Sequence, residues 1–241
     1  MAHRHINGDV LLHPGSALIE GVDLFKAMSR PELEDILRPA RVRRIQQGRA
    51  VFRQGDAARH FYLLVKGRLK VVQVTEDGQQ IVVRIVNTGE LFGVAKALRR
   101  PDYPGTAKAV AESIALAWDS ALWDEMTNRH PALTMNALHM VARHMQDLHA
   151  LVRELSTKDV EGRMAYALMR LSMQAGRHTK DGILIDFPVT RQDIAEMTGT
   201  TIPTVSRILS SWAERGLVES GRLRIVVREP CKLFDLARRE S

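Results

Sequence analysis

Cysteine is nearly absent from this chain of 241 residues, in which Cys231 is the single example. One cysteine excludes an internal disulfide and an iron–sulfur cluster held by the cysteines of one chain. No apolar run approaches the roughly 18 residues that a membrane-spanning helix needs. The N-terminal stretch MAHRHINGDV is polar and lacks the apolar core of a signal peptide. We therefore expect a cytoplasmic protein with no membrane partner.

Motifs of catalysis are missing as well. The sequence shows no nucleophile motif, no glycine-rich phosphate loop and no paired carboxylates at a useful spacing. A metal hydrolase that uses the histidines is the enzyme alternative, but their spacing resembles no zinc site. We expect no enzyme and no certain metal site, and we interpret Cys231 as a thiol without chemistry.

Length and charge point to two domains and a polyanionic partner. A chain of this length is too long for one small DNA-binding module, and a hydrophobic content of 45% supports proper cores. The formal net charge is +7 and the isoelectric point is near 9.9. Such a balance suits nucleic acid, although the charge is spread along the chain and does not identify a partner by itself.

The stretch TRQDIAEMTGTTIPTVSR, from Thr190 to Arg207, is typical of a helix-turn-helix. Ala195 provides a small side chain where the two helices cross, and Gly199 suits a turn with positive φ. Thr190 and Asp193 can form a reciprocal capping box. The positions expected to bury apolar groups between the helices are Ile194, Val205 and Ile208. Two ordinary amphipathic helices are the alternative, which is disfavoured because the small, glycine and apolar positions all agree.

A basic hairpin follows this motif directly. Residues 217–227, LVESGRLRIVV, read as two short strands around a Ser220-Gly221 turn. Arg222 and Arg224 alternate with apolar residues, so we expect both arginines on one face of the hairpin. Such a hairpin is typical of a wing that meets DNA phosphates.

The middle of the chain, from Arg49 to Ala117, reads as a compact β barrel or sandwich. It contains short runs of valine, isoleucine, leucine and aromatics punctuated by glycines. The segment from Glu76 to Gly78 is predicted to be a hairpin turn between VVQV and IVVRIV. Before this region, a capping box of Ser29 and Glu32 predicts a short helix that ends near Pro39.

A long helix is predicted from Pro131 to Ser156. Its apolar residues are spaced alternately by three and four, which predicts the a/d seam of a two-stranded coiled coil. The seam residues are Leu138, Val141, Met145, Leu148, Val152 and Leu155. The alternative is a helix that packs this stripe on its own barrel. We expect a homodimer, whose recognition helices lie about 34 Å apart on a near-palindrome.

In this order of elements, the chain resembles the CRP/FNR family of bacterial transcription regulators. The segments that carry the resemblance are VFRQGDAARHFYLLVKGRLKV, GELFG and the helix-turn-helix. The resemblance implies an α+β fold with a cyclic-nucleotide-binding-like β-roll (jelly roll), a long dimerisation helix and a winged helix-turn-helix. The expected boundaries are an arm at 1–22, the β-roll at 23–127, the helix at 128–157 and the DNA-binding domain at 158–241. It also implies double-stranded DNA and RNA polymerase as partners.

Two positions depart from the cyclic-AMP-binding members of the family. Those members carry a glutamate for the ribose and an arginine for the cyclic phosphate, where this chain has Val94 and Gly105. Neither side chain can replace these contacts, although Lys96 and Lys108 are close in sequence. The family's oxygen sensors need N-terminal cysteines, which are missing. We expect no iron–sulfur cluster, and a cyclic-nucleotide-responsive regulator, in which Lys96 or Lys108 takes over a lost contact, is the less favoured alternative.

The remaining resemblance is to the nitric-oxide-responsive DNR/NNR group of denitrification regulators. It lies in VFRQGDAARHFYLL and in PDYPGTAKAV. The group implies haem as the cofactor, nitric oxide as the signal, and denitrification or nitrosative-stress genes as targets. Histidine is a common haem ligand. The candidate ligands are His60, His3, His5, His13, His144 and His149. Each is also explained as a packed or solvated side chain, and a regulator controlled by its own abundance is the alternative function.

The recognition helix is expected to begin near Thr200 or Thr201, with Pro203 tolerated in its first turn. The predicted base-reading residues are Thr201, Thr204, Ser206 and Arg207. The last two match the serine and arginine of the FNR-type E-x-x-S-R pattern, which implies a TTG-like half-site core. Proline replaces the glutamate of that pattern, so specificity beside the core should change. The predicted phosphate contacts are Arg191, Gln192, Arg222 and Arg224.

Overall fold

The computed structural model describes residues 19 and 21–238 of the chain. The histidine candidates at 3, 5 and 13, and nearly all of the predicted arm, lie outside the described residues. The chain divides into two compact units. One comprises residues up to 73 together with 84–144, and the other comprises 74–83 together with 145 onwards.

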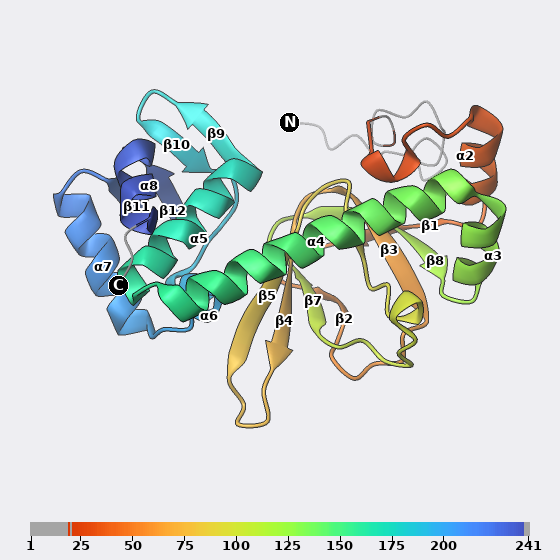
Figure 1. Ribbon diagram of the computed structural model, residues 1–241, viewed down its shortest axis with the longest axis horizontal. Helices are drawn as coiled ribbons and strands as arrows, with labels where there is room; N and C mark the ends of the chain where they lie inside the picture. The colour runs from red at the N-terminus through yellow and green to blue at the C-terminus, as the bar shows by residue number, and fades with distance from the viewer. Residues whose placement is uncertain (1–18, 20, 239–241) are drawn as a thin grey trace. The chain divides into compact units, whose positions relative to one another are not determined.

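The first unit is a β-roll preceded and followed by helices (Figure 1). Its helical elements are η1 (Asp23–Phe25), α2 (Arg30–Leu37), η2 (Lys96–Leu98) and α3 (Leu122–Arg129). The strands of the roll are β1 (Arg41–Ile45), β2 (Ala50–Phe52), β3 (His60–Lys66), β4 (Leu69–Val74), β5 (Gln80–Val86), β6 (Leu91–Phe92), β7 (Thr106–Ala109) and β8 (Ser113–Asp119), and residues 74–83 at the end of the β4–β5 hairpin are counted with the second unit. The strands form two sheets with the strand orders β1-β8-β3-β6 and β2-β7-β4-β5. The predicted roll is confirmed.

The strand β1 was not predicted, because the β-rich pattern was read from Arg49 onwards. Its sequence, RVRRI, contains three arginines, two of them adjacent, so the alternation of apolar and polar residues that predicts a strand is interrupted. The structure pairs it antiparallel with β8, from Arg41 opposite Ala117 to Ile45 opposite Ser113. It lies at the edge of its sheet. Charged side chains are common on edge strands because they hinder pairing with other chains.

The strand β3 divides the apolar core of the roll into two clusters. Phe61, Leu63 and Val65 contribute to a cluster with the helices, whereas Tyr62 and Leu64 contribute to a cluster between the sheets. This follows from the alternation of side chains along a strand. A central strand that is buried on both faces reads as an unbroken apolar run, which is what HFYLLVK shows.

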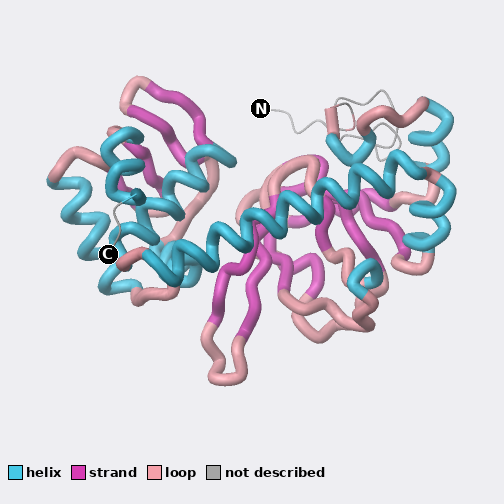
Figure 2. The backbone as a smooth tube through the Cα atoms, in the orientation of Figure 1, coloured by secondary structure: helices cyan, strands magenta, loops and turns pink. Residues whose placement is uncertain are grey.

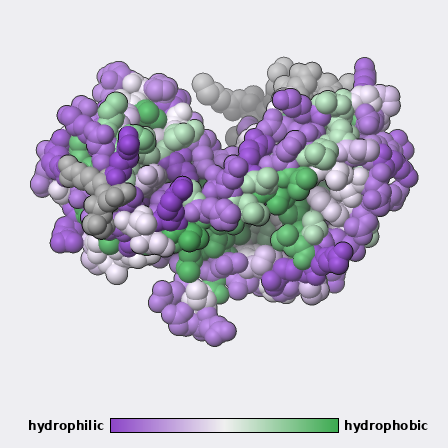
Figure 3. Space-filling view, viewed as in Figure 1, coloured by the Kyte–Doolittle hydropathy of each residue, from purple (hydrophilic) through white to green (hydrophobic). Residues whose placement is uncertain are grey.

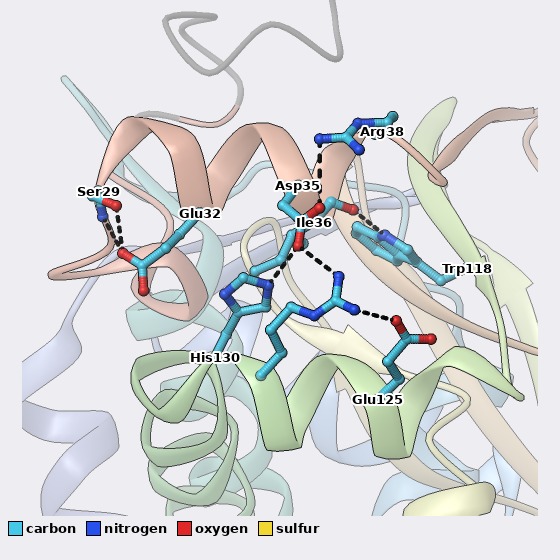
Figure 4. A network of polar contacts seen from close by, with 9 residues as sticks. Ser29, Glu32, Asp35, Ile36, Arg38, Trp118, Glu125 and His130 are labelled. Atoms are coloured by element: carbon cyan, nitrogen blue, oxygen red, sulfur yellow. Dashed lines mark hydrogen bonds and ion pairs between the residues drawn. The ribbon is translucent and has the colours of Figure 1, made fainter.

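Hydrogen bonds at both ends position α2, one set within the helix and one to the sheet (Figure 4). The Ser29 backbone N–H donates to Glu32 Oε2 at 2.8 Å and its hydroxyl donates to the same oxygen at 2.6 Å. This is the predicted capping box, which is confirmed. At the other end, Trp118 Nε1 on β8 donates to the Ile36 carbonyl at 2.8 Å. The helix is therefore tied to the sheet through a buried hydrogen bond.

A histidine that the sequence did not single out joins α2 to the segment after α3. His130 is 5% exposed, and its Nε2 lies 3.0 Å from Asp35 Oδ2 (Figure 4). Arg129 Nη1 donates to the same oxygen at 3.3 Å. The hydrogen bonds from Arg129 and His130 hold the pKa of the Asp35 carboxyl below its ordinary value. Because the partners are 95 residues apart in the chain, no local pattern could have shown this contact.

The predicted long helix is confirmed as α4 (Pro131–Thr157), one continuous element (Figure 2). It directly follows α3, a separate short helix that was not predicted. Leu133 and Ala137, in its first turns, are buried in the cluster shared with α2, β3 and β8. No helix of the described residues is long and apolar enough to cross a membrane.

The second unit is a winged helix-turn-helix. Its elements are α5 (Val160–Ala175), β9 (Gly176–Thr179), β10 (Gly182–Ile185), α6 (Arg191–Thr198), α7 (Ile202–Glu214), β11 (Val218–Gly221), β12 (Arg224–Val227) and α8 (Pro230–Arg238). The predicted helix-turn-helix and wing strands are confirmed. The wing belongs to a larger sheet of order β11-β12-β10-β9, in which β9 and β10 were not predicted.

Two hairpin glycines of the roll provide a matched test of local packing. Gly67 and Gly78 have φ of +92° and +81°, and both hairpins favour glycine for this reason. A Cβ at Gly67 would lie 2.4 Å from Ser113 Oγ and 2.5 Å from the Glu112 carbonyl, whereas a Cβ at Gly78 meets nothing within 4 Å. A side chain at either position would strain the backbone, but only at Gly67 would it also overlap with neighbouring atoms.

We expect Gly78→Ala to lower the free energy of unfolding by about 1 kcal/mol, the usual cost of the left-handed conformation. Gly67→Ala should lower it by about 3 kcal/mol or more, because steric overlap with backbone adds to the strain. Urea unfolding followed by circular dichroism, at one protomer concentration, measures both. Equal losses would show that the close approach at Gly67 carries no cost.

Candidate nucleic-acid interface

The angle between α6 and α7 is set by a left-handed turn. Gly199, the C-cap of α6, has φ +60° and ψ +46°. The nearest atom to a Cβ at this position is Leu155 Cδ2, at 4.0 Å. Conformation, not space, therefore selects glycine here, as predicted. The predicted capping box is also present, since the Thr190 hydroxyl accepts from the Asp193 N–H at 2.9 Å and the Thr190 N–H donates to Asp193 Oδ2 at 2.9 Å.

The inner face of α7 is buried. Val205, Leu209 and Trp212 are at most 1% exposed, and the predicted Ile208 is partly buried. Trp212 Nε1 donates to Glu161 Oε1 on α5 at 2.7 Å. The helix is thus anchored by apolar packing and by a hydrogen bond to a charged group, and it can hold its outer face in a constant orientation.

The outer face of α7 carries the predicted base-reading residues. Arg207 is exposed and Ser206 is partly exposed. Arg207 has no hydrogen-bond or ion-pair partner within the described part of the chain. Thr201 is the N-cap, and its hydroxyl lies 3.0 Å from that of Thr204. The Thr201 oxygen is therefore already used in capping, while Arg207 offers its whole guanidinium group to a ligand.

The wing turn differs from the prediction. Gly221 pairs with Arg224, so the turn is formed by Arg222 and Leu223 and not by Ser220 and Gly221. Leu223 has φ +61° and is 46% exposed. The assumed alternation of arginines therefore fails, because a turn residue has no strand face. A leucine in the left-handed region is unusual and stores backbone strain at the tip of the wing.

The arginines predicted to contact phosphate differ in whether their guanidinium groups are already paired within the protein. Glu219 accepts a hydrogen bond from Arg224 Nη1 and another from Arg228 Nη2, the latter at 2.6 Å. These two hydrogen bonds hold the pKa of the Glu219 carboxyl below its ordinary value, and the bond from Arg228 has the larger effect. Arg224 is therefore paired within the wing. Arg191 and Arg222 are exposed, and neither has a partner among the residues described.

Gln192, the remaining predicted phosphate contact, also lies on the exposed first turn of α6. Its side-chain amide donates to Glu196 Oε1 at 2.8 Å. The amide must leave this bond, or share its second hydrogen, to reach a phosphate. Of the four predicted phosphate contacts, Arg191 and Arg222 are the two that the structure leaves available.

The predicted seam of α4 is exposed along its length. The exposed fractions are 56% for Leu138, 46% for Val141, 55% for Met145, 37% for Leu148, 61% for Val152 and 45% for Leu155. Figure 3 shows hydrophobic surface along the course of this helix. Exposure of six large apolar side chains in one stripe to water is unfavourable in free energy, so the stripe favours a partner.

Aromatic rings stack within the apolar cluster between the two sheets of the roll. Phe52 and Tyr103 stack with their centroids 3.7 Å apart, and Tyr62 and Phe92 stack at 5.0 Å. The Tyr103 hydroxyl donates to the His60 carbonyl at 2.6 Å and accepts from the His60 N–H at 3.1 Å. Burial raises the pKa of both tyrosine hydroxyls. The rings and this double hydrogen bond fix the loop before β7 against β3.

The residues that differ from cyclic-nucleotide binders do not fit such a ligand. A Cβ at Gly105 would lie 2.9 Å from the Val72 carbonyl, so an arginine side chain cannot be built there without moving β4. Val94 packs against the helix-side cluster. None of these positions offers a group for a ribose or a phosphate.

The described histidine candidates lie on two elements, β3 and α4. His60 is partly buried at the start of β3, with its ring 6.1 Å from that of Tyr62. His144 is partly buried and His149 is exposed on α4. Within the described residues, no group of three or more histidine, cysteine, aspartate or glutamate side chains is placed to hold a metal ion. Among the described residues, the aromatic cluster between the two sheets of the roll contains no histidine. Cys231 is exposed and free.

Comparison with known proteins agrees with both halves of the fold. The cyclic nucleotide-binding domain family matches residues 42–130, and the Crp-like helix-turn-helix domain family matches residues 162–236. A β-roll of this kind joined to a winged helix-turn-helix defines a DNA-binding transcription regulator.

Relatives match this chain along most of its length. The chain is 28% identical over 219 residues to the cyclic AMP receptor protein of Thermus thermophilus, covering 91% of this chain and 98% of that protein. It is 29% identical over 197 residues to the global nitrogen regulator of Synechococcus elongatus, covering 81% and 89%. A crystal structure of another CRP-family regulator from Thermus thermophilus superposes with a TM-score of 0.70 at 26% identity, covering 81% of this chain and 96% of that chain. This chain thus carries both characteristic domains of CRP/FNR-type transcription regulators and is similar to them along most of its length.

Similarity to this family implies DNA binding and dimer formation. The relatives are named as a receptor protein and as a regulator, and not as enzymes, which supports the prediction of a non-enzymatic protein. They carry names that refer to cyclic AMP, to nitrogen, and to fumarate and nitrate reduction. The resemblance to the DNR/NNR group therefore stays a prediction.

Proposed function

We propose that this protein is a homodimer that reads a near-palindromic DNA site with a TTG-like core. The observation that carries the proposal is the exposed guanidinium of Arg207, which has no partner among the residues that the structure describes, on the outer face of a helix whose inner face is buried. An arginine in this position of a recognition helix can bind O6 and N7 of guanine with two hydrogen bonds. Ser206 lies beside it, and Pro203 provides no acceptor for a cytosine amino group.

The second copy of the chain is the occupant that best fits the seam of α4. The three-and-four spacing of the six apolar residues matches a two-stranded coiled coil, in which each side chain enters a hole on the facing helix. In a parallel pair with Leu138 at position a, His144 and His149 occupy the flanking g and e positions. A dimer provides two recognition helices for two half-sites one helical turn apart. By family resemblance, RNA polymerase is the partner at the promoter.

For the signal, we propose that the roll responds to something other than a cyclic nucleotide. The stacked rings of Phe52 and Tyr103 and the packing at Val94 and Gly105 support this view. A regulator controlled by its own abundance, or gated in a different way, fits a roll that is filled by its own side chains.

Haem with nitric oxide, for the control of denitrification or nitrosative-stress genes, is the second candidate signal. His60 favours it most among the described histidines, because its ring is partly exposed while both of its backbone groups are held by Tyr103. A ligand at this position would lie at the edge of the roll and not inside it. Haem iron, when bound, supplies a centre for a diatomic gas.

Substitutions of Arg207 and Arg222 distinguish the reading of a base from the binding of a phosphate. With a duplex that the wild-type protein selects from a random pool, Arg207→Ala should weaken binding by about 1–3 kcal/mol and relax the preference at one guanine. Arg222→Ala should weaken binding about equally for all sequences and lower the slope of log affinity against log salt by about 1. Fluorescence anisotropy at several salt concentrations measures both. Full discrimination at the guanine in Arg207→Ala would contradict the assignment.

Leu148→Glu tests the dimer seam. A charge at the centre of an apolar interface is costly unless it is paired, so we expect a monomer in sedimentation velocity and a loss of affinity for a two-half-site duplex. Met173→Glu is the matched control, since Met173 is 84% exposed on α5 and outside the seam. If Leu148→Glu remains a dimer at micromolar concentration, the interface lies elsewhere.

An anaerobic absorbance titration with ferrous haem, followed by nitric oxide, separates the two candidate signals. Saturation at about one haem per subunit, with a Soret band that shifts on adding nitric oxide, is the outcome expected for a gas sensor. His60→Ala should then abolish the sharp band, and His178→Ala, an exposed histidine on β9, should keep it. A broad band that does not saturate would leave the roll without haem and favour gating by abundance.

A further inference from the structure

The first turn of the recognition helix presents an apolar side chain to solvent. Ile202, the first residue of α7, is 43% exposed. The large apolar residues of the inner face of this helix are far less exposed: Val205, Leu209 and Trp212 are at most 1% exposed. Ile202 is therefore not part of the core, and its exposure costs free energy until another apolar group covers it.

Helix geometry places Ile202 next to the proposed base-reading residues. Successive residues of an α-helix are rotated by about 100°, so side chains four positions apart are neighbours on the surface. Ile202 is therefore the neighbour of Ser206, and Pro203 is the neighbour of Arg207. The N-terminal end of a recognition helix is also the part that meets base edges in the major groove.

The chemistry of this turn restricts what it can read. Neither Ile202 nor Pro203 has a side-chain donor or acceptor, so neither can use the hydrogen-bonding pattern of a base pair. The apolar feature that bases present in the major groove is the 5-methyl group of thymine. An exposed isoleucine at a groove-facing position matches this group in size and polarity.

We infer that Ile202 is a specificity residue that selects thymine through its 5-methyl group. The inference rests on the proposed function, because it needs α7 to lie in the major groove. Ile202 precedes Arg207 by five positions, or about 7.5 Å along the helix axis. Since base pairs are stacked about 3.4 Å apart, the thymine lies about two base pairs from the guanine that Arg207 reads.

Deoxyuridine tests this inference because it pairs like thymine but lacks the methyl group. A duplex selected by the wild-type protein is resynthesised with deoxyuridine at one thymine of each half-site in turn. We expect a loss of affinity of about fourfold per half-site at one position, which corresponds to one buried methyl group. Placing 5-methylcytosine at this position, paired with guanine, should bind better than unmethylated cytosine there.

Variants assign the effect to the side chain. Ile202→Ala should bind the thymine and deoxyuridine duplexes with equal affinity, whereas Ile202→Val, which keeps a branched apolar side chain, should retain most of the discrimination. Met173→Ala, a truncation of an exposed apolar residue outside the motif, should discriminate as the wild type does. Thermal melting of each variant shows that the fold is kept.

Two results would overturn the inference. One is a wild-type protein that binds every deoxyuridine duplex as tightly as the thymine duplex, which needs no variant to interpret. The other is an Ile202→Ala protein with an unchanged ratio of thymine to deoxyuridine affinity. In both cases a selected TTG-containing site would leave the proposed function standing. If the random pool yields no enriched duplex, the proposed function fails together with the inference.

Discussion

Burial of one face of α7 is the constraint on which the DNA-reading surface depends. Val205, Leu209 and Trp212 fill the space beneath the helix, and Glu161 holds the indole N–H of Trp212. A hydrogen bond to a base edge needs correct distance and angle, so a helix that moved on its support would discriminate poorly. The buried face fixes the helix, and the left-handed turn at Gly199 fixes its angle to α6. Arg207 and Ile202 gain their proposed roles from this support.

Filling of space also distinguishes the β-roll. A cyclic nucleotide needs space for its sugar and a positive charge for its phosphate. In this chain, Phe52 and Tyr103 stack on each other, Gly105 lies against the β4 backbone, and Val94 is apolar. The first turns of α4 join the same fold through Leu133 and Ala137, which pack with β3 and β8. The roll and the start of the long helix are thus coupled by direct packing. A signal that alters this packing has a physical route to α4 within the first unit.

Local interactions were predicted well, and interactions between distant residues were not. Both capping boxes and the glycine turn of the helix-turn-helix follow from residues within ten positions of one another. The arginine-rich edge strand β1 was missed because its partner is β8, and His130 was missed because Asp35 lies 95 residues away. The wing turn was misplaced by two residues, since alternation was extended through Leu223. Leucine rarely adopts a positive φ, so the residue type did not predict the conformation that Leu223 takes in the folded hairpin.

The sequence by itself determined the order of the elements, the helix-turn-helix, the apolar seam of α4 and the family resemblance. These features are encoded by periodicity, capping and turn residues, which act over a few positions. Only the tertiary structure decided which arginines are available and which are paired, that aromatic rings occupy the roll, and that Ile202 faces solvent while Val205 is buried. Exposure and pairing depend on what the rest of the chain brings to each residue, and packing alone determines that.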